Sequence, residues 1–278
     1  METAEDFEIP WHTTLGMPTN ASTGNKYNGI NIILLWCRTK EQGHASSTWA
    51  TYKQWQSLGA QVTKGQKGSQ IIIYKPMKQE DNQPLSDKEH NRPRVFIGSA
   101  TVFNASQVEG YVVTDDKLKP EADNTERLES VEQFILSAQA DIRLGGDRAF
   151  YAPMEDYIAM PGRELFTGTS TISATEAYYS TLFHEMTHWS GSEKRCGRDM
   201  SGRFGGQSYA MEELVAEIGA AYLCANKGVS STPRLDHANY LKNWLKVIKK
   251  DEKAIFWAAT RAQEAVTYLN SLETESNI

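Results

Sequence analysis

The sequence predicts an α+β protein of two domains, a small mixed domain over residues 1–120 and a mainly helical domain over residues 121–278. A length of 278 residues fits one large or two modest domains. The stretch 114–130 is polar, charged and contains a proline, which is typical of an exposed connection. The charge also changes sign along the chain. Residues 11–110 carry 11 Lys+Arg and 6 Asp+Glu (net +5), whereas residues 121–278 carry 16 and 23 (net −7), which indicates different partners for the two domains.

Composition excludes several classes of protein. With 40% hydrophobic and 23% charged residues the chain resembles an ordinary globular protein. No apolar run approaches the roughly 20 residues that a membrane helix needs, and the acidic N-terminus lacks the features of a signal peptide. The three cysteines, Cys37, Cys196 and Cys224, are widely spaced and are expected to be free thiols. We therefore expect a cytoplasmic protein with no membrane partner.

The first domain is predicted to combine helices and strands. Residues 29–43 are largely apolar and predict a buried helix. Residues 48–60 place Trp49, Tyr52 and Trp55 near helical spacing and predict a second helix.

Strands are predicted to follow these helices. Residues 61–74 indicate a strand, a glycine-containing turn and a strand. Two runs rich in β-formers, 69–77 and 94–105, flank a polar stretch at 78–94. This pattern predicts a hairpin with a long excursion.

The second domain is predicted to be mainly helical. Helical patterns cover 130–141, 173–190, 209–226, 236–250 and 252–272. Alternating apolar and aromatic residues over 147–161 indicate short strands or a hairpin. Ser173 and Glu176 form a capping-box pattern at the start of the second of these helices. Gly191 lies at its end, where a glycine is favoured.

That helix carries an H-E-x-x-H motif formed by His184, Glu185 and His188. Histidines four residues apart project from one face of a helix, so both imidazoles can bind one metal ion. Glu185, beside the first ligand, would act as the catalytic general base and then donate the proton to a leaving amine. The alternative is a chance match, because the motif is short and histidine pairs on helices are often ordinary surface or core residues.

A third ligand is available downstream. The helix predicted over 209–226 carries Glu212, Glu213 and Glu217, of which the last two share a face. In a His2Glu site one carboxylate binds the metal and a second orients a ligand histidine, which favours Glu213 as ligand and Glu217 behind a histidine. Glu212 is the alternative ligand, although it could simply stabilise the helix N-terminus. The expected ion is Zn²⁺, with Mn²⁺ or another divalent ion as the alternative.

Candidate substrate residues are harder to locate from sequence. A peptidase usually holds an extended substrate against an edge strand, which the stretch 149–161 could supply, with Asp156 and Tyr157 beside the substrate. A Tyr or His should stabilise the oxyanion, and Tyr209 and His237 are the candidates.

Five segments together resemble the ArdC-type antirestriction proteins of plasmids and phages. They are PTNASTGNKYNGINIILLW, STWATYKQWQSLGAQVTKGQKG, TVFNASQ, FHEMTHWSG and YAMEELVAEIGAAYLC. The resemblance runs from about residue 10 to residue 270 and is far more specific than the H-E-x-x-H motif alone. It implies an N-terminal single-stranded-DNA-binding domain, a C-terminal zincin-like metallopeptidase domain of the gluzincin type, and protection of incoming plasmid or phage DNA from host restriction.

The first domain contains the residue types that single-stranded DNA binding requires, namely cationic groups and aromatic faces for stacking bases. Polar residues precede the first helix, aromatic and basic residues alternate in the next segment, and two lysines flank a glycine turn. The expected DNA-binding residues are Asn20, Thr23, Lys26, Tyr27, Asn31, Trp49, Tyr52, Lys53, Lys64 and Lys67. The alternative is that the tryptophans form core and the lysines are merely solvated.

Three functions are compatible with these patterns. The first is an antirestriction protein that binds single-stranded DNA and also acts on a host restriction protein or another protein substrate. The second is a cytoplasmic zinc metallopeptidase whose first domain binds protein. The third is a DNA-binding protein with a non-catalytic metal site. Glu185 favours the first two, because a purely structural metal site has no use for a base beside the metal.

Overall fold

The computed structural model of the chain describes residues 16–76, 95–112, 124–166, 173–200, 207–229, 251 and 253–276. These residues form two compact units. The sheet unit takes in the described residues of 18–27 and 38–113, and the helical unit takes in those of 1–17, 28–37 and 114–278.

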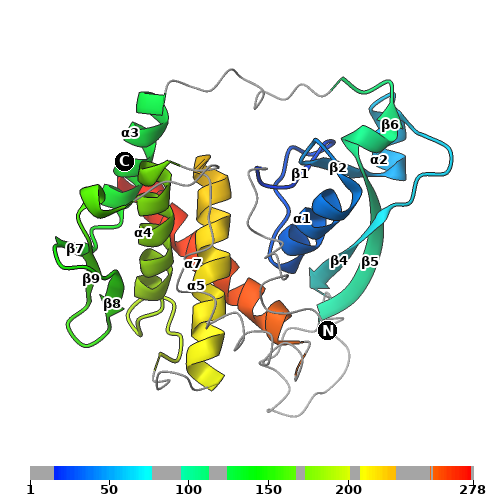
Figure 1. Cartoon of the computed structure of the whole chain (residues 1–278). Coiled ribbons are helices and arrows are strands. Elements are labelled where there is room, and N and C mark those ends of the chain that lie inside the picture. Colours follow the sequence, from blue (N-terminus) through cyan, green and yellow to red (C-terminus); the bar gives the residue numbers. More distant parts are fainter. Residues whose placement is uncertain are drawn as a thin grey trace, which may run out of the picture. The chain divides into compact units, whose positions relative to one another are not determined.

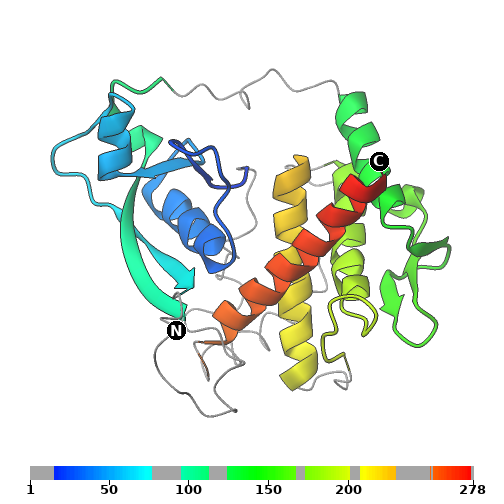
Figure 2. The same ribbon diagram turned by 180° about the vertical axis from the view of Figure 1, so that it is seen from behind.

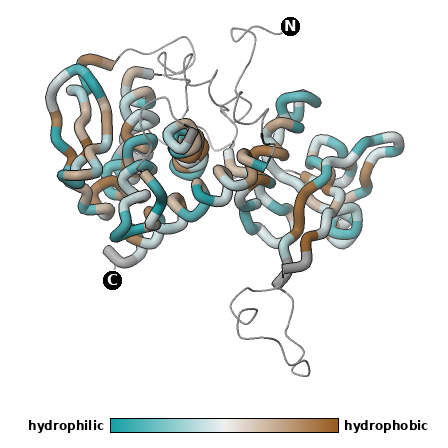
Figure 3. Tube along the Cα trace, turned by 90° about the horizontal axis from the view of Figure 1, so that it is seen from below, coloured by the Kyte–Doolittle hydropathy of each residue, from teal (hydrophilic) through white to brown (hydrophobic). Residues whose placement is uncertain are grey.

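The sheet unit is organised around a four-stranded sheet with the order β1-β2-β5-β4 (Figure 1). Its strands are β1 (Thr19–Asn20), β2 (Thr48–Thr51), β4 (Ser69–Pro76) and β5 (Val95–Asn104). β1 and β2 are parallel, and the other neighbours are antiparallel. The β4–β5 pairing runs from Ser69 opposite Val102 to Pro76 opposite Val95, which confirms both predicted strands. The predicted excursion between them lies outside the described residues. Figure 3 shows hydrophobic stretches along this hairpin.

The predicted helix over residues 48–60 is wrong in its first turn. Residues 48–51 form β2, and the helix α2 covers only Tyr52–Ser57. The Thr51 side chain accepts a hydrogen bond from Gln54 N (3.3 Å), and the Gln54 side chain accepts one from Thr51 N (2.9 Å). This capping box starts the helix after residue 51, while pairing with β5 keeps the preceding residues extended.

The strands predicted on either side of the glycine turn exist but belong to different sheets. β3 (Gln61–Val62) pairs with β6 (Val108–Glu109), whereas β4 pairs with β5. Trp55 of α2 is fully buried in the sheet unit. Its indole N–H donates a hydrogen bond to Phe103 O at 3.0 Å. The core around it is completed by Ala50, Ala60, Val62 and Ala105.

The helix α1 (Ile30–Gln42) confirms the predicted helix over 29–43 and takes part in both units. Its beginning groups with the helical unit. Tyr222 donates a hydrogen bond to Gly29 O (2.9 Å), and the Trp36 ring packs edge-on against the Tyr222 ring at 5.8 Å. Residues 28–37 therefore pack with the later part of the chain, whereas the sequence-based division at residue 120 counted them with the first domain.

The described residues of the helical unit that follow residue 113 form long helices and a small sheet. The helices are α3 (Asn124–Ser137), α4 (Ala174–Ser190), α5 (Gln207–Lys227) and α7 (Ala254–Ser276). The sheet consists of β7 (Asp141–Leu144), β8 (Phe150–Ala152) and β9 (Tyr157–Met160), in the order β7-β9-β8. The predicted helix over 236–250 lies outside the described residues. The β8–β9 hairpin confirms the prediction for 147–161, whereas β7, which runs parallel to β9, was not predicted.

α4 and α5 lie side by side, with α7 packed across them (Figure 2). Every residue of α4 from Tyr178 to Ser190 is buried. The close approach of the two helices depends on Gly219, because a Cβ at that position would lie 2.5 Å from Thr187 Cγ2. Such a distance is too short for two carbon atoms, so the packing requires glycine here.

No helix among the described residues is long and apolar enough to cross a membrane. All three cysteines are free, as predicted, and Cys224 is buried in α5.

Candidate metal centre

The capping box predicted for α4 is present. Ser173 Oγ accepts from Glu176 N (3.2 Å), and Glu176 Oε2 accepts from Ser173 N (2.9 Å). Gly191 ends the helix for a different reason from the one expected. The backbone φ of Gly191 is −75°, a value that any residue can adopt, so the helix end does not need glycine for a left-handed conformation. A Cβ there would instead lie 2.7 Å from Arg198 Nη2, so the glycine makes room for an arginine side chain.

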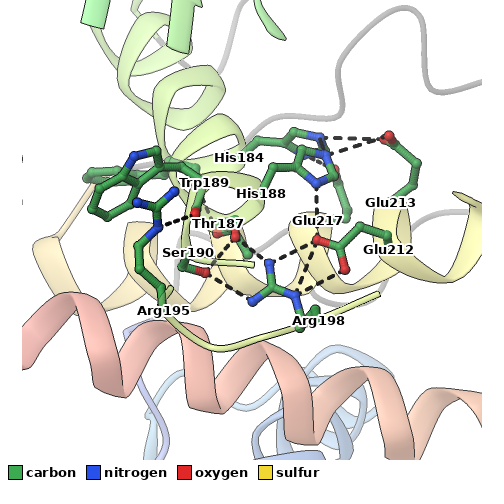
Figure 4. A network of polar contacts seen from close by, with 11 residues as sticks. His184, Thr187, His188, Trp189, Ser190, Arg195, Arg198, Glu212, Glu213 and Glu217 are labelled. Atoms are coloured by element: carbon green, nitrogen blue, oxygen red, sulfur yellow. Dashed lines mark hydrogen bonds and ion pairs between the residues drawn. The ribbon is translucent and has the colours of Figure 1, made fainter. Parts of the chain in front are cut away.

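Three ligand atoms from α4 and α5 converge (Figure 4). They belong to His184, His188 and Glu213, all of which are buried. The two Nε2 atoms lie 3.1 Å apart; His184 Nε2 lies 3.6 Å from Glu213 Oε2, and His188 Nε2 lies 3.6 Å from Glu213 Oε1. Ligand atoms bonded to one tetrahedral ion at about 2.0–2.2 Å lie roughly 3.3–3.5 Å from one another. The spacing therefore fits a divalent ion held by these three side chains.

The opposite nitrogen of each imidazole faces a second carboxylate. His184 Nδ1 lies 3.4 Å from Glu217 Oε2, and His188 Nδ1 lies 3.2 Å from Glu212 Oε1. A carboxylate beside Nδ1 favours a proton on that nitrogen, so the Nε2 lone pairs face each other and Glu213. A cation relieves the repulsion between such lone pairs. Glu213 thus lies on the ligand side of the rings, and Glu212 lies behind His188.

The electrostatics of the carboxylates agree with this arrangement. Burial alone would raise the pKa of Glu213, but its contacts with His184, His188 and Tyr209 lower the pKa to about 2. Burial likewise opposes the lowered pKa of Glu212, which results from hydrogen bonds to His188 and Arg198. Both groups are therefore carboxylates at neutral pH, which is the form that ligates metal or orients histidine.

Tyr209 also belongs to this centre. Its side chain makes a hydrogen bond to Glu213, four residues later on α5. Glu185 follows His184 on α4 and is itself buried, with 3% of its surface exposed. His237, the other predicted oxyanion partner, lies outside the described residues.

Asp156 and Tyr157 have structural partners in the small sheet. Asp156 accepts hydrogen bonds from Tyr151 Oη (2.8 Å) and Arg195 Nη1 (3.1 Å). The Arg143 guanidinium lies 3.9 Å from the centre of the Tyr157 ring. Within the stretch 149–161, β8 lies at an edge of the described sheet, whereas β9, which Tyr157 begins, is paired on both sides. Among the described strands, the outer edges of this sheet belong to β7 and β8.

The predicted DNA-binding residues divide by exposure. Six are exposed: Thr23, Lys26, Tyr52, Lys53, Lys64 and Lys67. Asn20, Tyr27 and Asn31 are half-buried, and Asn31 groups with the helical unit. Trp49 must be corrected, because its side chain is 0% exposed and its ring packs edge-on against His44, so it has no face free for a base. Asn20 fastens its own loop, since its side chain donates to Tyr27 Oη and accepts from Thr23 N.

Comparison with known proteins gives a family for both parts of the chain. Residues 1–103 match the N-terminal domain of the anti-restriction factor ArdC, and residues 129–261 match the zincin-like metallopeptidases. Crystal structures of the antirestriction protein ArdC from plasmid R388 are 36% identical in the metal-free form and 35% in the Mn(II)-bound form, with TM-scores of 0.74 and 0.73. They cover 96% and 95% of this chain, and the chain covers 92% and 91% of theirs.

The chain belongs to the ArdC family of antirestriction proteins.

Two other proteins are similar to almost the whole of this chain. The uncharacterized protein y4eC of Sinorhizobium fredii is 38% identical over 98% of this chain and 88% of its own length. The DNA primase TraC of Escherichia coli is 35% identical over 96% of this chain, which spans only 25% of that longer protein. The zincin-like domain and the Mn(II)-bound relative indicate a divalent metal ion, in agreement with the ligand spacing.

Two residues that matter in this ArdC-family chain were missed from the sequence. Gln107 is buried and donates to Lys67 O (3.0 Å) and Gln66 Oε1 (3.1 Å), so it holds the glycine turn that carries the lysines. Arg198 is buried and binds Glu212, which in turn contacts the candidate ligand His188. Neither lies in a periodic pattern, although Gln107 closes the quoted segment TVFNASQ.

Proposed function

We propose that this ArdC-family chain binds single-stranded DNA through its sheet unit and protects incoming plasmid or phage DNA from host restriction in the cytoplasm. Its helical unit would hold a divalent ion, Zn²⁺ or Mn²⁺, through His184, His188 and Glu213. The observation that carries the metal centre is the convergence of one ligand atom from each of these three buried side chains, all within 4.8 Å of one another. The family assignment supports the antirestriction role.

The residues around the metal position suit peptide hydrolysis. A bound ion supplies Lewis acidity to the scissile carbonyl. Glu217 and Glu212 face Nδ1 of the two imidazoles, which would leave both Nε2 atoms available to hold the ion. Glu185 would accept a proton from the attacking water and pass it to the leaving amine. Tyr209, hydrogen-bonded to Glu213, is the described residue best suited to donate to the developing oxyanion.

The proposed DNA-binding surface consists of exposed side chains on backbone that hydrogen bonds hold in place. Gln107 holds the turn that presents Lys64 and Lys67, so these charges are pre-organised for phosphates. Tyr52 is 42% exposed and its ring packs edge-on against Phe103, which leaves a face for base stacking. Phe103, partly buried, is a further aromatic beside it that the sequence did not single out.

One experiment separates peptidase chemistry from DNA protection. Glu185→Gln should keep the metal and abolish any proteolysis, whereas His188→Ala should lose the metal. Each variant is measured in a restriction-protection assay and by metal content. Full protection by Glu185→Gln would favour the alternative of a DNA-binding protein with a non-catalytic metal site. Loss of protection with metal retained would support peptidase chemistry as part of the function.

A second experiment tests the DNA interface. Lys64→Glu with Lys67→Glu should weaken binding of single-stranded DNA and flatten its salt dependence, because each phosphate contact contributes about −0.7 to the slope of log affinity against log salt. The matched control is Lys194→Glu with Lys253→Glu, which changes the net charge equally at exposed lysines of the helical unit. If both double variants bind alike at low salt, the turn is not part of the interface. Absence of DNA binding by the unaltered chain would favour a metallopeptidase whose first domain binds protein.

A further inference from the structure

We infer that Arg198 and Glu212 act as a positioning pair that holds the His188 ring with Nε2 directed at the metal. This inference rests on the metal centre proposed above. It assigns a role to a side chain from the loop between α4 and α5, which supplies none of the three ligand atoms.

The contacts form a continuous chain from the arginine to the ligand. Arg198 Nε lies 3.0 Å from Glu212 Oε2, and Arg198 Nη2 lies 2.9 Å from Glu212 Oε1. The same Oε1 lies 3.2 Å from His188 Nδ1 (Figure 4). The guanidinium thus binds both carboxylate oxygens, which leaves the carboxylate one orientation from which to accept the Nδ1 proton.

Arg198 also fastens the end of the helix that carries His188. Its Nη1 donates to Ser190 Oγ at 3.0 Å, and its Nη2 donates to Thr187 O. The arginine fits there because residue 191 is glycine. A Cβ at that position would lie 2.7 Å from Arg198 Nη2. The last turn of α4, the following loop and the start of α5 therefore meet at one guanidinium.

The contact between Arg198 and Glu212 matters because both side chains are buried. The side chains of Arg198 and Glu212 are 2% and 8% exposed, so neither charge is hydrated enough to stand alone. The contact between the two side chains holds the Glu212 carboxylate in the orientation that faces His188 Nδ1. Removing the arginine takes away the contacts that fix the orientation of the Glu212 carboxylate, which is then free to turn away from Nδ1 and release the ring.

The chain contains a matched control in Arg195. This arginine fastens the same end of α4, because its Nε donates to Trp189 O and its guanidinium stacks on the Trp189 ring at 3.9 Å. Its carboxylate partner is Asp156, on the small sheet, rather than Glu212. Arg195→Gln therefore removes a comparable structural contact without touching the support of a ligand.

The test measures Zn²⁺ affinity of the full chain by competition with a chelator, together with thermal unfolding of the metal-free form. Arg198→Gln and Glu212→Gln should each weaken Zn²⁺ binding, with about 10–100-fold expected for loss of an outer partner of a ligand histidine. Arg195→Gln should lower the unfolding temperature but keep the Zn²⁺ affinity. Long-range ¹H–¹⁵N spectra of the metal-free protein should show the Nδ1-protonated form of His188 in the unaltered chain and in Arg195→Gln, and a shift in both other variants.

The possible outcomes are separable. If Arg198→Gln and Glu212→Gln bind Zn²⁺ as tightly as Arg195→Gln and leave the His188 signals in place, the positioning role is wrong. If His188→Ala binds Zn²⁺ like the unaltered chain, the metal centre itself is wrong. Glu212→Gln preserves side-chain volume, so it decides the question even if Arg198→Gln does not fold.

Discussion

The α4–α5 pair buries charged side chains as well as apolar ones, whereas the buried residues described in the sheet unit are all uncharged. Between the helices the buried groups include two histidines and three glutamates, each facing another polar partner. In the sheet unit the fully buried side chains include Trp49 and Trp55, and the lysines expected to bind DNA are exposed. Each charged side chain buried between the helices needs a polar partner in a fixed position. Exposed lysines that are expected to bind DNA can remain hydrated until they bind.

The difference predicts where substitutions act. In the helix pair, changes should alter metal affinity and stability together, because the ligands are also part of the packing. In the sheet unit, stability and DNA affinity should separate, because buried aromatics and exposed groups are different residues.

Trp49→Ala should give the largest loss of stability. The side chain is fully buried in β2, and truncating a buried tryptophan costs about 3–5 kcal/mol of unfolding free energy. Chemical denaturation of the full chain measures this loss. If Trp49→Ala is as stable as the unaltered chain but binds single-stranded DNA poorly, the ring is a base-stacking platform after all.

Gly219→Ala should lower both the unfolding free energy, by about 1–3 kcal/mol, and the Zn²⁺ affinity. The added Cβ would lie 2.5 Å from Thr187 Cγ2, and Thr187 is itself held by a hydrogen bond to Phe183 O, so the helices must separate. The gain of about 1 kcal/mol in helix propensity works in the opposite direction. The same substitution in a Thr187→Ala background should cost less in both measurements. A cost unchanged by that background would show that the helix contact is not the cause.

Tyr52→Ala should weaken single-stranded DNA binding with a smaller effect on stability. Stacking of one base on an aromatic ring is worth about 1–3 kcal/mol, and the Tyr52 ring is 42% exposed. Fluorescence anisotropy with a labelled oligonucleotide measures the binding, and denaturation checks the fold. Unaltered affinity would contradict a stacking role for Tyr52.

Asp156→Asn should produce the smallest effect, and one that depends on pH. The hydrogen bond from Arg195 holds the pKa of Asp156 below its ordinary value. The folded state therefore binds this proton less readily than the unfolded state, so the stabilisation is complete above the ordinary aspartate pKa of about 4 and is lost as pH falls through the folded value. Unfolding temperatures of both proteins should differ at pH 7 and converge in acid. Asp141→Asn, at an exposed pair with Arg143, is the control and should change little at either pH. A difference that persists in acid would point to lost packing instead.

The residues that converge at the candidate metal centre were predictable because helical spacing fixes the direction of side chains. His184 and His188, four residues apart, had to project together, and Glu213 and Glu217 had the same relation on the next helix. The capping box at Ser173 was equally local. The boundary at Thr51 was not predicted, because the strand before it is stabilised by pairing with β5, which lies about fifty residues later in the chain.

From the sequence alone it was possible to predict the helices α1, α4, α5 and α7, the β4–β5 strands and the projection of two histidines from one helix face. These follow from local periodicity and from capping between residues a few positions apart. Only the tertiary structure decided that Glu212 lies behind His188, that Arg198 binds it, and that Gly191 and Gly219 serve close packing. Each of these depends on distances between segments that approach only after folding, and spacing along a single helix carries no information about such distances.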